Sequence, residues 1–558
     1  MCNSRFLVVI ETQRVKGYLF ASSILRETRG ASLLLDQLNR TETRKLLESY
    51  QGCSEEIYLG GGSGRILFES KDKAEEFAGR VRELYRQKTV NARISVEVVR
   101  RDKKENGQDE SVPDWMARGV RESQENKLGR IEAVPMLAGR WIRPCSSCGK
   151  EAARAIRSDI QGTHRLCTSC LYKRAKVRDF YHDDKRNWDI SIPIPPLSKL
   201  RQRWPDFILT TLSETIARDC GKEKRICLPQ DFDQIAEHSK PSNYIAFIYA
   251  DGNRMGDTIK TMGQKFPDDA SAKDAYRVFS QIVDQATREA AVRAVLQHVP
   301  KTTRCAESAC FVPAEFVLAG GDDLILVVPA NAALDVAACF ISLYQAKTIA
   351  LQQEWIHQGE FFAPKGLTTS AGVVIAHASY PASQLMDLAG ELMKLAKRKA
   401  ADLESNHLEG TLDFMVLHSA GSEKIKERRE KEYKTHSAEG HALTERPYTA
   451  TGAFKLLERI RALKRSDVPR TKLRALYPIL FKELLQAQFE GLQIKERLKA
   501  TGALTTGLPL EALVDGLSCF PFRKQSNGNL TTPLSELIEL YDFVQPGATE
   551  ASEEAAHG

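Results

Sequence analysis

The segment that most constrains the fold of this chain is Phe316–Pro329, with the sequence FVLAGGDDLILVVP. Its two short apolar runs, Phe316–Ala319 and Leu324–Val328, predict two antiparallel strands joined by a tight turn. Glycine tolerates the positive φ that a two-residue hairpin turn requires, so we expect Gly320 and Gly321 at the tip. Because both runs are apolar throughout, we expect the hairpin to lie in the middle of a sheet that helices cover.

Two carboxylates, Asp322 and Asp323, lie at the tip of this apolar hairpin. A carboxylate in such a place costs free energy unless a partner neutralises it. Hard divalent cations are the usual partner, because Mg²⁺ prefers carboxylate oxygens and leaves positions open for substrate phosphates. An exposed acidic turn without a ligand is the alternative, and the four residues alone do not decide between the two.

A third acid, Asp251, ends the apolar run YIAFIYAD at residues 244–251. The segments that follow predict the order β-α-β-β-α-β-α-β of a split ferredoxin-like unit, in which the first strand lies beside the hairpin. Asp251, Asp322 and Asp323 are therefore expected to converge, which favours a two-metal site for phosphoryl or nucleotidyl transfer with Mg²⁺ or Mn²⁺. The expected elements after Asp251 are a helix at 271–298, the hairpin, a helix at 331–352, a strand at 367–376, a helix at 382–403 and a strand at 411–417.

The first part of the chain predicts the same architecture a second time. Its expected elements are a strand at 5–11, a helix at 18–40, strands at 56–59 and 65–68, a helix at 72–87 and a strand at 92–99. The sequence Gly60-Gly61-Gly62-Ser63-Gly64 stands where the second copy has its acids. We interpret this part as a diverged internal duplicate that holds no metal. The polar segment 101–128 is expected to be a loop or insertion, with a short helix around Trp115.

Four cysteines form two pairs, Cys145 with Cys148 and Cys167 with Cys170, and 18 residues separate the pairs. Two CxxC pairs at this spacing predict a structural zinc site, because tetrahedral Zn²⁺ needs four thiolates and each pair supplies two. A closed site of four sulfurs has no open position for catalysis. A redox CxxC is the alternative, and the presence of two copies makes it less favoured.

The composition is that of an ordinary globular protein, with 42% hydrophobic residues, 27% charged residues and a net charge of +7. The excess of positive charge is too small to establish nucleic-acid binding. No apolar run is expected to reach the roughly 20 residues that span a bilayer, and the apolar core of the N-terminal segment is too short for a signal peptide. We expect no membrane contact, and the scattered cysteines outside the pairs favour a cytoplasmic location.

These patterns predict an α/β (α+β) chain with two ferredoxin-like domains, an inserted zinc ribbon and a helical C-terminal domain. The expected boundaries are 1–128 for the first ferredoxin-like domain, 129–175 for the ribbon, 176–240 for a connector, 241–420 for the domain with the GGDD sequence, 421–446 for a charged linker, 447–545 for the helical domain and 546–558 for a disordered tail.

The strand that ends at Asp251, the GGDD sequence and the basic segment LMKLAKRKA resemble the nucleotide-cyclase palm of the large subunit of type III CRISPR effector complexes. The palm fold is shared with diguanylate cyclases and polymerases. The order in this chain also resembles that family, which has a degenerate palm, a four-cysteine zinc element, an active GGDD palm and a helical C-terminal domain. The resemblance covers most of the chain.

The resemblance implies a nucleotidyltransferase that joins ATP molecules into cyclic oligoadenylates in antiviral defence. It implies ATP as ligand and, as candidate partners, the subunits of an RNA-guided complex and target RNA; self-association is left open. A lysine in an Ala-Lys context contacts the triphosphate in that family, and the first palm completes the nucleotide pocket. For the polar residues carried over, an ordinary solvated helix surface is the alternative. The residues carried over as nucleotide-binding are Gly320, Gly321, Lys397, Arg398, Ser23 and Arg29.

Some members of that family carry an N-terminal HD nuclease domain. Here the first palm is expected to begin at residue 5, so we expect no HD nuclease, and His182 and Asp183 are interpreted as loop residues. Two further functions stay open: a catalytically silent scaffold subunit of an RNA-guided complex, and a cyclase that makes a different cyclic nucleotide. Fold analogy does not choose among these.

Overall fold

The structure is a computed structural model that describes residues 5–103, 108–128, 142–159, 162–181, 211–214, 225–266, 268–300, 309–355, 362–403, 408–418, 425, 427, 429, 442–465, 470–500, 520–524 and 528–546. His182 and Asp183 lie outside the described residues. The first palm denotes residues 5–128 below, and the second palm denotes residues 244–418.

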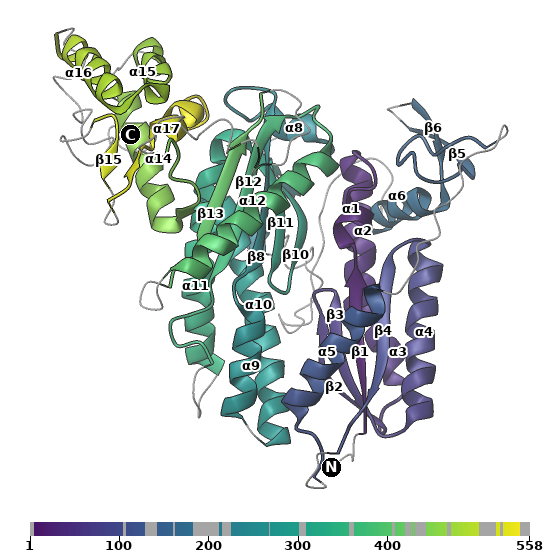
Figure 1. Cartoon of the computed structure of the whole chain (residues 1–558). Coiled ribbons are helices and arrows are strands. Elements are labelled where there is room, and N and C mark those ends of the chain that lie inside the picture. Colours follow the sequence, from purple (N-terminus) through teal and green to yellow (C-terminus); the bar gives the residue numbers. More distant parts are fainter. Residues whose placement is uncertain are drawn as a thin grey trace.

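The first palm is built on a four-stranded antiparallel sheet with the order β2-β3-β1-β4 (Figure 1). Helices that precede and follow the β2–β3 hairpin in the sequence cover one face of this sheet. There Val8, Ile66 and Phe68 pack with Leu35, Phe77 and other side chains. The strands are β1(Phe6–Gln13), β2(Ser54–Gly60), β3(Ser63–Phe68) and β4(Arg93–Arg100), and the helices are α1(Val15–Leu19), α2(Leu25–Asp36), the π-helix η1(Gln37–Glu42), α3(Thr43–Glu48) and α4(Lys71–Thr89).

The expected single helix over 18–40 is wrong, because the chain leaves helical geometry between α1 and α2. Ile24 is extended, with φ −86° and ψ 117°. The hydroxyl of Ser22 accepts a hydrogen bond from the Ile24 N–H at 3.1 Å, a local bond that competes with the helix ladder. The apolar periodicity continues across this break, so the pattern alone does not reveal it.

The polar segment expected as a loop or insertion contains a long helix, α5(Val112–Leu128), that covers the second face of the first sheet. Trp115 is fully buried there, and its indole N–H donates to the Val99 carbonyl at 3.1 Å. A Cβ at Gly119 would lie 2.9 Å from Val9, so the glycine allows close contact between helix and sheet.

The second palm is built on a six-stranded sheet with the order β10-β11-β8-β12-β13-β14. Its first four strands repeat the spatial order of the first palm, which supports the internal duplication. The strands are β8(Tyr244–Gly252), β10(Glu315–Gly320), β11(Asp323–Pro329), β12(Thr369–His377), β13(Thr411–Val416) and β14(Tyr448–Thr449), and the helices are α9(Met255–Lys265), α10(Asp269–His298), α11(Ala333–Trp355) and α12(Ala382–Asp402).

Each face of the second sheet has its own cover. Ala246, Ile248 and Ala250 of β8 point into the core formed with α10 and α11. Phe247 and Tyr249 point to the opposite face, which α12 shares with side chains of the first palm. The two palms therefore share hydrophobic core as well as a surface, and Figure 1 shows them side by side.

By length and composition, the segment Ala330–Glu354 around α11 could cross a membrane. The expectation that no run is long and apolar enough is therefore wrong for this segment. Within the protein 61% of its most apolar 18-residue window is buried, against α10 and the sheet, as in the core helix of a globular domain. Its apolar character is explained by this position between layers.

Smaller modules flank the palms at opposite ends of the molecule in Figure 1. The four-cysteine module contains β5(Ala155–Asp159) and β6(Gly162–Leu166), followed by α6(Thr168–Tyr181). The C-terminal module contains α14(Ala450–Arg465), α15(Arg470–Leu476), η4(Pro478–Phe481), α16(Leu484–Ala500), β15(Arg523–Lys524), β16(Leu530–Thr531) and α17(Leu534–Leu540). Short elements before the second palm and beside its hairpin are β7(Arg225–Cys227), α8(Phe232–Ala236) and β9(Ala309–Phe311).

Large parts of the predicted connector, charged linker and tail lie outside the described residues. In the connector, Phe232 and Ile235 of α8 are buried in the core on the Phe247 face. In the linker, the Arg429 guanidinium binds the buried Asp413 carboxylate with N–O distances of 2.6 and 2.7 Å. The predicted domain boundaries stay predictions.

Candidate functional site

The three predicted acids meet at one end of the β8–β11 pair. Leu324 pairs with Ala250, so the same antiparallel register places Asp323 opposite Asp251. Since side chains alternate along a strand, Asp251, Asp323 and Tyr249 lie on one face of the sheet. Asp322 lies in the turn, and a Cβ at Gly252 would be 3.0 Å from the Asp322 side chain.

The tip differs in detail from the expected turn. Gly320 pairs with Asp323, so the two residues of the turn are Gly321 and Asp322. Of the two glycines, only Gly321 has positive φ, at 62°. This geometry fits a turn with glycine at the first central position. The expectation that both glycines form the tip is therefore wrong for Gly320.

The acids carry the electrostatic signature of a cation site. Burial, followed by the neighbouring carboxylates, raises the pKa of Asp322 to about 7 and that of Asp323 to about 6. The Tyr249 hydroxyl donates to Asp323 Oδ1 at 3.0 Å, and burial beside these acids raises the pKa of the phenol. The ammonium of Lys397 lies 2.7 Å from Asp251 Oδ2. Carboxyls that repel one another in a partly buried site are stabilised by a bound cation.

The donor set of hard carboxylate oxygens fits Mg²⁺ or Mn²⁺. The carboxylate oxygens of the three acids do not, however, lie close enough together to coordinate one ion as they stand. Within the described part of the chain, only the cysteine cluster has three or more ligand atoms within 4.8 Å of one another. Lys397 contacts one oxygen of Asp251, and Tyr249 contacts one oxygen of Asp323.

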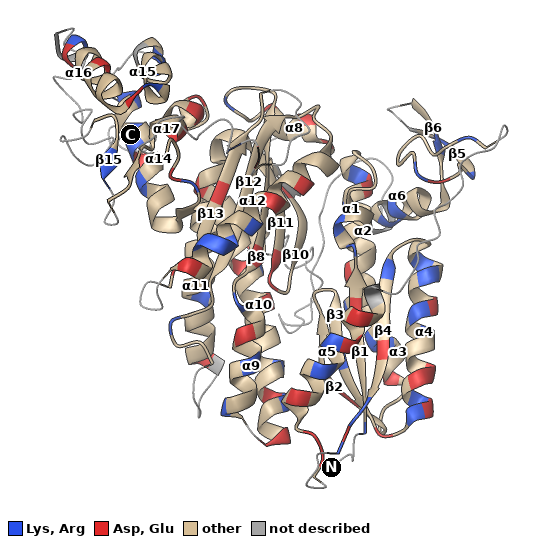
Figure 2. Cartoon of the chain, in the orientation of Figure 1, with Lys and Arg blue, Asp and Glu red and all other residues tan. Residues whose placement is uncertain are grey.

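Lys397 lies on α12, where the basic positions of this helix are visible in Figure 2. The structure thus places Lys397 beside the acids, and the triphosphate contact that the resemblance implies for it stays a prediction. Arg398, the next residue on the helix, is exposed. Successive helical residues point about 100° apart, so the two cannot face the acids together. A nucleotide-binding role for Arg398 stays a prediction.

The hairpin tips of the two palms meet head to head. A Cβ on Gly61 would lie 3.1 Å from the Cα of Gly321, so a side chain at Gly61 would require its neighbour to move, whereas Gly321 is required by its positive φ of 62°. Asp284 of α10 accepts a hydrogen bond from the Gly321 N–H at 3.0 Å, and Thr287 donates to the Gly321 carbonyl at 2.7 Å. Arg40 of the first palm lies 2.5 Å from Asp284 Oδ1. The first palm therefore helps to hold the turn that carries Asp322.

The strand pairing of the two palms identifies the residues of the first palm that correspond to the three acids of the second. Gly60 pairs with Ser63 as Gly320 pairs with Asp323, and Glu11 pairs with Ser63, as Asp251 lies opposite Asp323. The expectation of glycines in place of all acids is corrected here, because Glu11 stands at the position of Asp251. Arg65 lies 3.2 Å from the Glu11 carboxylate and neutralises it internally.

Of the two residues carried over in the first palm, Arg29 has a different place from the one expected. It is buried, forms two hydrogen bonds with the Glu315 carboxylate and donates to the Pro229 carbonyl at 2.7 Å. It joins the first palm to β10, and its guanidinium is engaged in this ion pair. Ser23 is exposed, and its role stays a prediction.

Two functional candidates escaped the sequence analysis. Lys16, at the start of α1 in the first palm, places its ammonium 3.6 Å from the centre of the Tyr249 ring. Tyr249 itself reads as a core residue in an apolar strand. Nothing in the sequence signals that a lysine near the N-terminus reaches β8, because the contact depends on how the palms are packed.

A cavity of about 620 Å³ lies between the palms and includes Asp322 and Gly321 in its wall. It is bounded by β2, by α5 and by α9 and α10. Its wall combines aromatic and basic side chains, which suits a base and its phosphates. The members that define it are Tyr58, Tyr276, Phe279, Arg44, Arg65 and Arg277.

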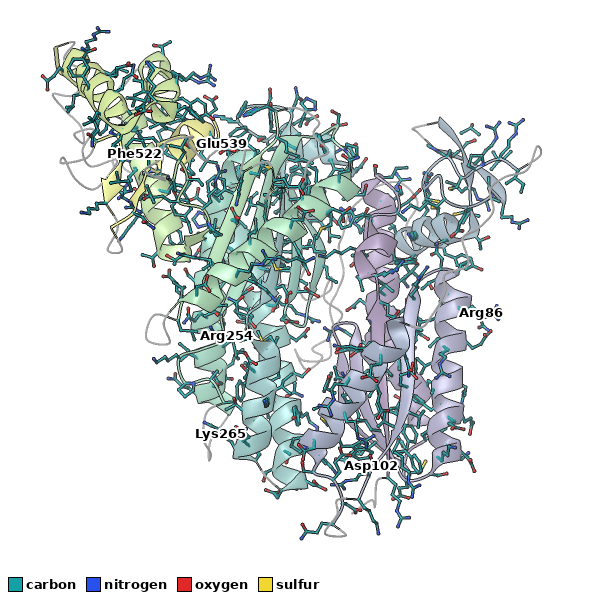
Figure 3. The ribbon with its side chains drawn as sticks, viewed as in Figure 1. Arg86, Asp102, Arg254, Lys265, Phe522 and Glu539 are labelled. Atoms are coloured by element: carbon teal, nitrogen blue, oxygen red, sulfur yellow. The ribbon has the colours of Figure 1, made fainter. Side chains whose placement is uncertain are left out.

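Arg254, labelled in Figure 3, ends the loop that follows Asp251. It has φ 52°, caps α9 at its N-terminus and donates to the Ala401 carbonyl at 2.7 Å. Arg14 stands at the same place before α1, with φ 50°. The left-handed arginine before the first helix is therefore common to both palms.

The four predicted cysteines form one cluster. Cys145, Cys148, Cys167 and Cys170 have their sulfurs within 4.8 Å of one another, and three of the four are buried. Four thiols in this arrangement fit a tetrahedral zinc ion. The helix that follows is anchored to the first palm, because the Arg174 guanidinium lies 2.7 Å from the buried Glu27 carboxylate and the Lys173 ammonium donates to the Tyr18 carbonyl at 2.7 Å.

Comparisons with known proteins agree with this architecture. Residues 244–403 match the family model of Cas10/Cmr2, second palm domain. No curated protein sequence matches the chain.

Solved structures match over nearly the whole chain. A Csm1–Csm4 cassette in complex with cA3 has a TM-score of 0.54 at 13% identity, covering 98% of this chain and 70% of that one. The cassette with cA4 has a TM-score of 0.52 at 13% identity, covering 96% and 70%. Csm1 of T. onnurineus has a TM-score of 0.51 at 13% identity, covering 97% and 70%. Together these matches show that the chain has the fold of Csm1 and that residues 244–403 are similar to the second palm domain of Cas10/Cmr2.

Proposed function

We propose that this Cas10-like chain is a metal-dependent nucleotidyltransferase that converts ATP into cyclic oligoadenylates in CRISPR-type antiviral defence. The observation that carries the proposal is the convergence of Asp251, Asp322 and Asp323 at one rim, with two of the pKa values raised and Lys397 beside them. Csm1–Csm4 cassettes of the same fold have been solved in complex with cA3, cA4 and ATP, which supports this substrate class.

In the proposed reaction the 3′-oxygen of one ATP attacks the α-phosphorus of another. A new P–O3′ bond forms, the bond to pyrophosphate breaks, and the 3′-hydroxyl proton is lost to solvent. Asp251, Asp322 and Asp323 would hold Mg²⁺ or Mn²⁺, which would supply Lewis acidity and lower the pKa of the 3′-hydroxyl. Lys397 would meet the charge of the departing pyrophosphate, a role that its position beside Asp251 supports. Gly321 lets the backbone approach the nucleotide without a side chain in the way.

The cavity between the palms supports a second nucleotide beside the first. Its volume of about 620 Å³ lies within the usual range of ligand pockets. Of the three acids Asp322 alone is in its wall, so a nucleotide there would reach the site at Asp322. Adenine preference, product size and the role of Gly320 and Ser23 remain parts of the proposal.

We further propose structural Zn²⁺ in the cysteine cluster and assembly with subunits of an RNA-guided complex. The relatives solved as Csm1–Csm4 cassettes support the second point. A silent scaffold is the second candidate function. It is favoured by one observation, the loss of the aspartate pair from the first palm, where Ser63 and Gly62 stand in its place.

The test is product formation by the purified protein with labelled ATP and Mn²⁺, with and without partner RNA, read by mass spectrometry of the nucleotides. Replacing both Asp322 and Asp323 by alanine is expected to abolish conversion while the fold is kept. A matched control removes two exposed carboxylates of α4, Asp72 and Glu75, and is expected to keep full conversion. Undiminished product from the first variant rejects the enzymatic assignment, and no product from the wild-type protein under either condition favours the scaffold.

A further inference from the structure

We propose that Ser370 and Thr411 are positioning residues for the cation site, because their buried hydroxyls fix the strand end that carries Asp251 against α12. This inference rests on the proposed function and deepens it, since it names two residues that act on the acids through other groups. The hydrogen-bonded set of Asn253, Ser370, Thr411 and the Ala396 carbonyl is called the polar row below.

The polar row continues the line of the acids across the second sheet. Asp251 of β8 has Asp323 on one side and pairs with Ser370 of β12 on the other. Ser370 pairs in turn with Thr411 of β13. Because partners directly across neighbouring strands point to the same face, these four side chains lie on the face that α12 covers. Figure 1 shows α12 lying across β12 and β13.

The two hydroxyls are buried in a face of the sheet that is largely apolar. Ser370 and Thr411 each have an exposed fraction of 0%. A hydroxyl in such a core costs free energy unless it is hydrogen-bonded. Ser370 Oγ lies 2.8 Å from Asn253 Oδ1 and 2.9 Å from Thr411 Oγ1, and the Thr411 hydroxyl lies 2.7 Å from the Ala396 carbonyl oxygen. The hydroxyls are therefore satisfied only by one another and by these two end groups.

Each end of the polar row is attached to an element that carries part of the site. Asn253 follows Asp251 by two residues, and its backbone N–H donates to the Thr368 carbonyl at 2.9 Å. Ala396 lies on α12 directly before Lys397, whose ammonium is 2.7 Å from Asp251 Oδ2. The row therefore joins the loop after Asp251 to the turn of α12 that contacts this acid.

A glycine lets α12 lie close enough to the sheet for this connection. Gly372 follows Ser370 by two residues, so it is on the same face of β12. A Cβ at Gly372 would collide with the Ala389 carbonyl of α12. Ala389 and Ala396 are about two helical turns apart and both are buried, so the same side of the helix faces the sheet at both places.

A count of protons gives the polar row a direction. It has three contacts, but Ser370 and Thr411 supply only one hydroxyl proton each. Half a turn of the Asn253 amide supplies the third, because its nitrogen then donates to Ser370. Ser370 in turn donates to Thr411, Thr411 donates to the Ala396 carbonyl, and the Thr368 hydroxyl, 3.1 Å from the amide, donates to the amide oxygen. Loss of either hydroxyl of the row leaves a buried group without its partner, so the row acts as a unit.

The experiment measures Mn²⁺ binding to the full chain by calorimetry without nucleotide, and kcat and KM for ATP in Mn²⁺. Thr411→Val keeps the shape of the side chain and removes one hydroxyl, and Ser370→Ala removes the other. Each is expected to weaken Mn²⁺ binding about tenfold, as loss of groups that orient metal ligands does, and to lower kcat more than it changes KM. Amide hydrogen exchange in the segment that contains Asn253 should be faster in both metal-free variants. Thr411→Ser keeps the hydroxyl and is expected to restore the Mn²⁺ affinity and the slow exchange.

The matched control is Thr89→Val in the first palm. Thr89 is also fully buried, and its hydroxyl donates to the Tyr85 carbonyl of α4 at 2.7 Å. Its loss is expected to reduce the stability to urea as much as Thr411→Val does, and to leave the Mn²⁺ affinity at the wild-type value. Urea unfolding of each variant shows that it is folded before Mn²⁺ is added. If Thr411→Val does not fold, Ser370→Ala, the smaller change, decides on its own.

Wild-type Mn²⁺ affinity in the folded variants of Ser370 and Thr411 overturns the inference. An equal loss of affinity in Thr89→Val also overturns it, because that result assigns the effect to general destabilisation, and so does a failure of Thr411→Ser to restore binding. A wild-type protein that binds Mn²⁺ but makes no product overturns the proposed function alone, since the Mn²⁺ titrations still decide the inference. A wild-type protein that binds no Mn²⁺ overturns both.

Discussion

The three acids Asp251, Asp322 and Asp323, called the acid rim below, are expected to destabilise the metal-free protein. The substitution Asp323→Asn tests this directly. The substitution keeps the size of the side chain and an oxygen that accepts from the Tyr249 hydroxyl. Burial and Asp251 raise the pKa of Asp323 from 3.8 to about 6. A rise of about two units corresponds to about 3 kcal/mol at neutral pH. Because the rim is partly open to water, we expect the variant to gain about 2 kcal/mol.

The sign of the pH dependence follows from the raised pKa. A carboxyl whose pKa is higher in the folded state favours folding when protonated, so below about pH 4 it costs nothing. The cost appears as the pH rises from about 4 to 6 and is complete above that range. Asp323→Asn should therefore match the wild type at pH 4 and exceed it at pH 7.5, by roughly 4 °C in Tm for about 2 kcal/mol.

The assay is thermal unfolding of the protein dialysed into buffer without Mg²⁺ or Mn²⁺, from pH 4 to pH 8. The control is Asp72→Asn on the exposed surface of α4, which should show no such pH dependence. Adding Mn²⁺ should raise the Tm of the wild type and do so less for Asp323→Asn. A gain that is the same at every pH, or largest at pH 4, would refute the account of the rim as a site that demands a cation.

Two further predictions concern the contacts that hold the modules in place. Arg29→Met should cost about 3–5 kcal/mol of unfolding free energy because it leaves the Glu315 carboxylate buried and unpaired, whereas Arg29→Met with Glu315→Leu should regain most of it; denaturant unfolding of both variants checks this, and equal loss in the two would contradict it. Cys148→Ser should lower the bound zinc measured by metal analysis well below one per chain, whereas Cys53→Ser, outside the cluster, should leave it unchanged.

The acidic part of the site was predictable because it depends on local pattern and simple topology. Asp251 ends an apolar strand, and Asp322 and Asp323 lie between two others. Once the order of elements predicts a split ferredoxin-like unit, the strand and the hairpin must be neighbours. The cysteine cluster was predictable for the same reason, because its spacing is a local signal.

The contacts between the palms were not predictable, because they join residues far apart in the chain. The sequence predicts Arg29 on a helix surface, yet in the structure it is buried and bound to the Glu315 carboxylate. Lys16 and Arg40 have no motif, and their positions at Tyr249 and Asp284 depend on how two sheets pack. The helix break after α1 was not predictable for a different reason. The periodic pattern of apolar residues continues across it, and the local feature at the break is one hydrogen bond to the Ser22 hydroxyl.

The contact between Gly61 and Gly321 joins two halves that a symmetric enzyme would have to recruit from separate molecules. With both halves in one chain the pairing has no dissociation constant, so dilution cannot switch the site off. The two halves also differ in sequence at this place: the second palm has Asp322 and Asp323, and the first palm has Gly62 and Ser63. Regulation of such a site is expected to change the relative orientation of the two palms, because their association is fixed by the covalent chain.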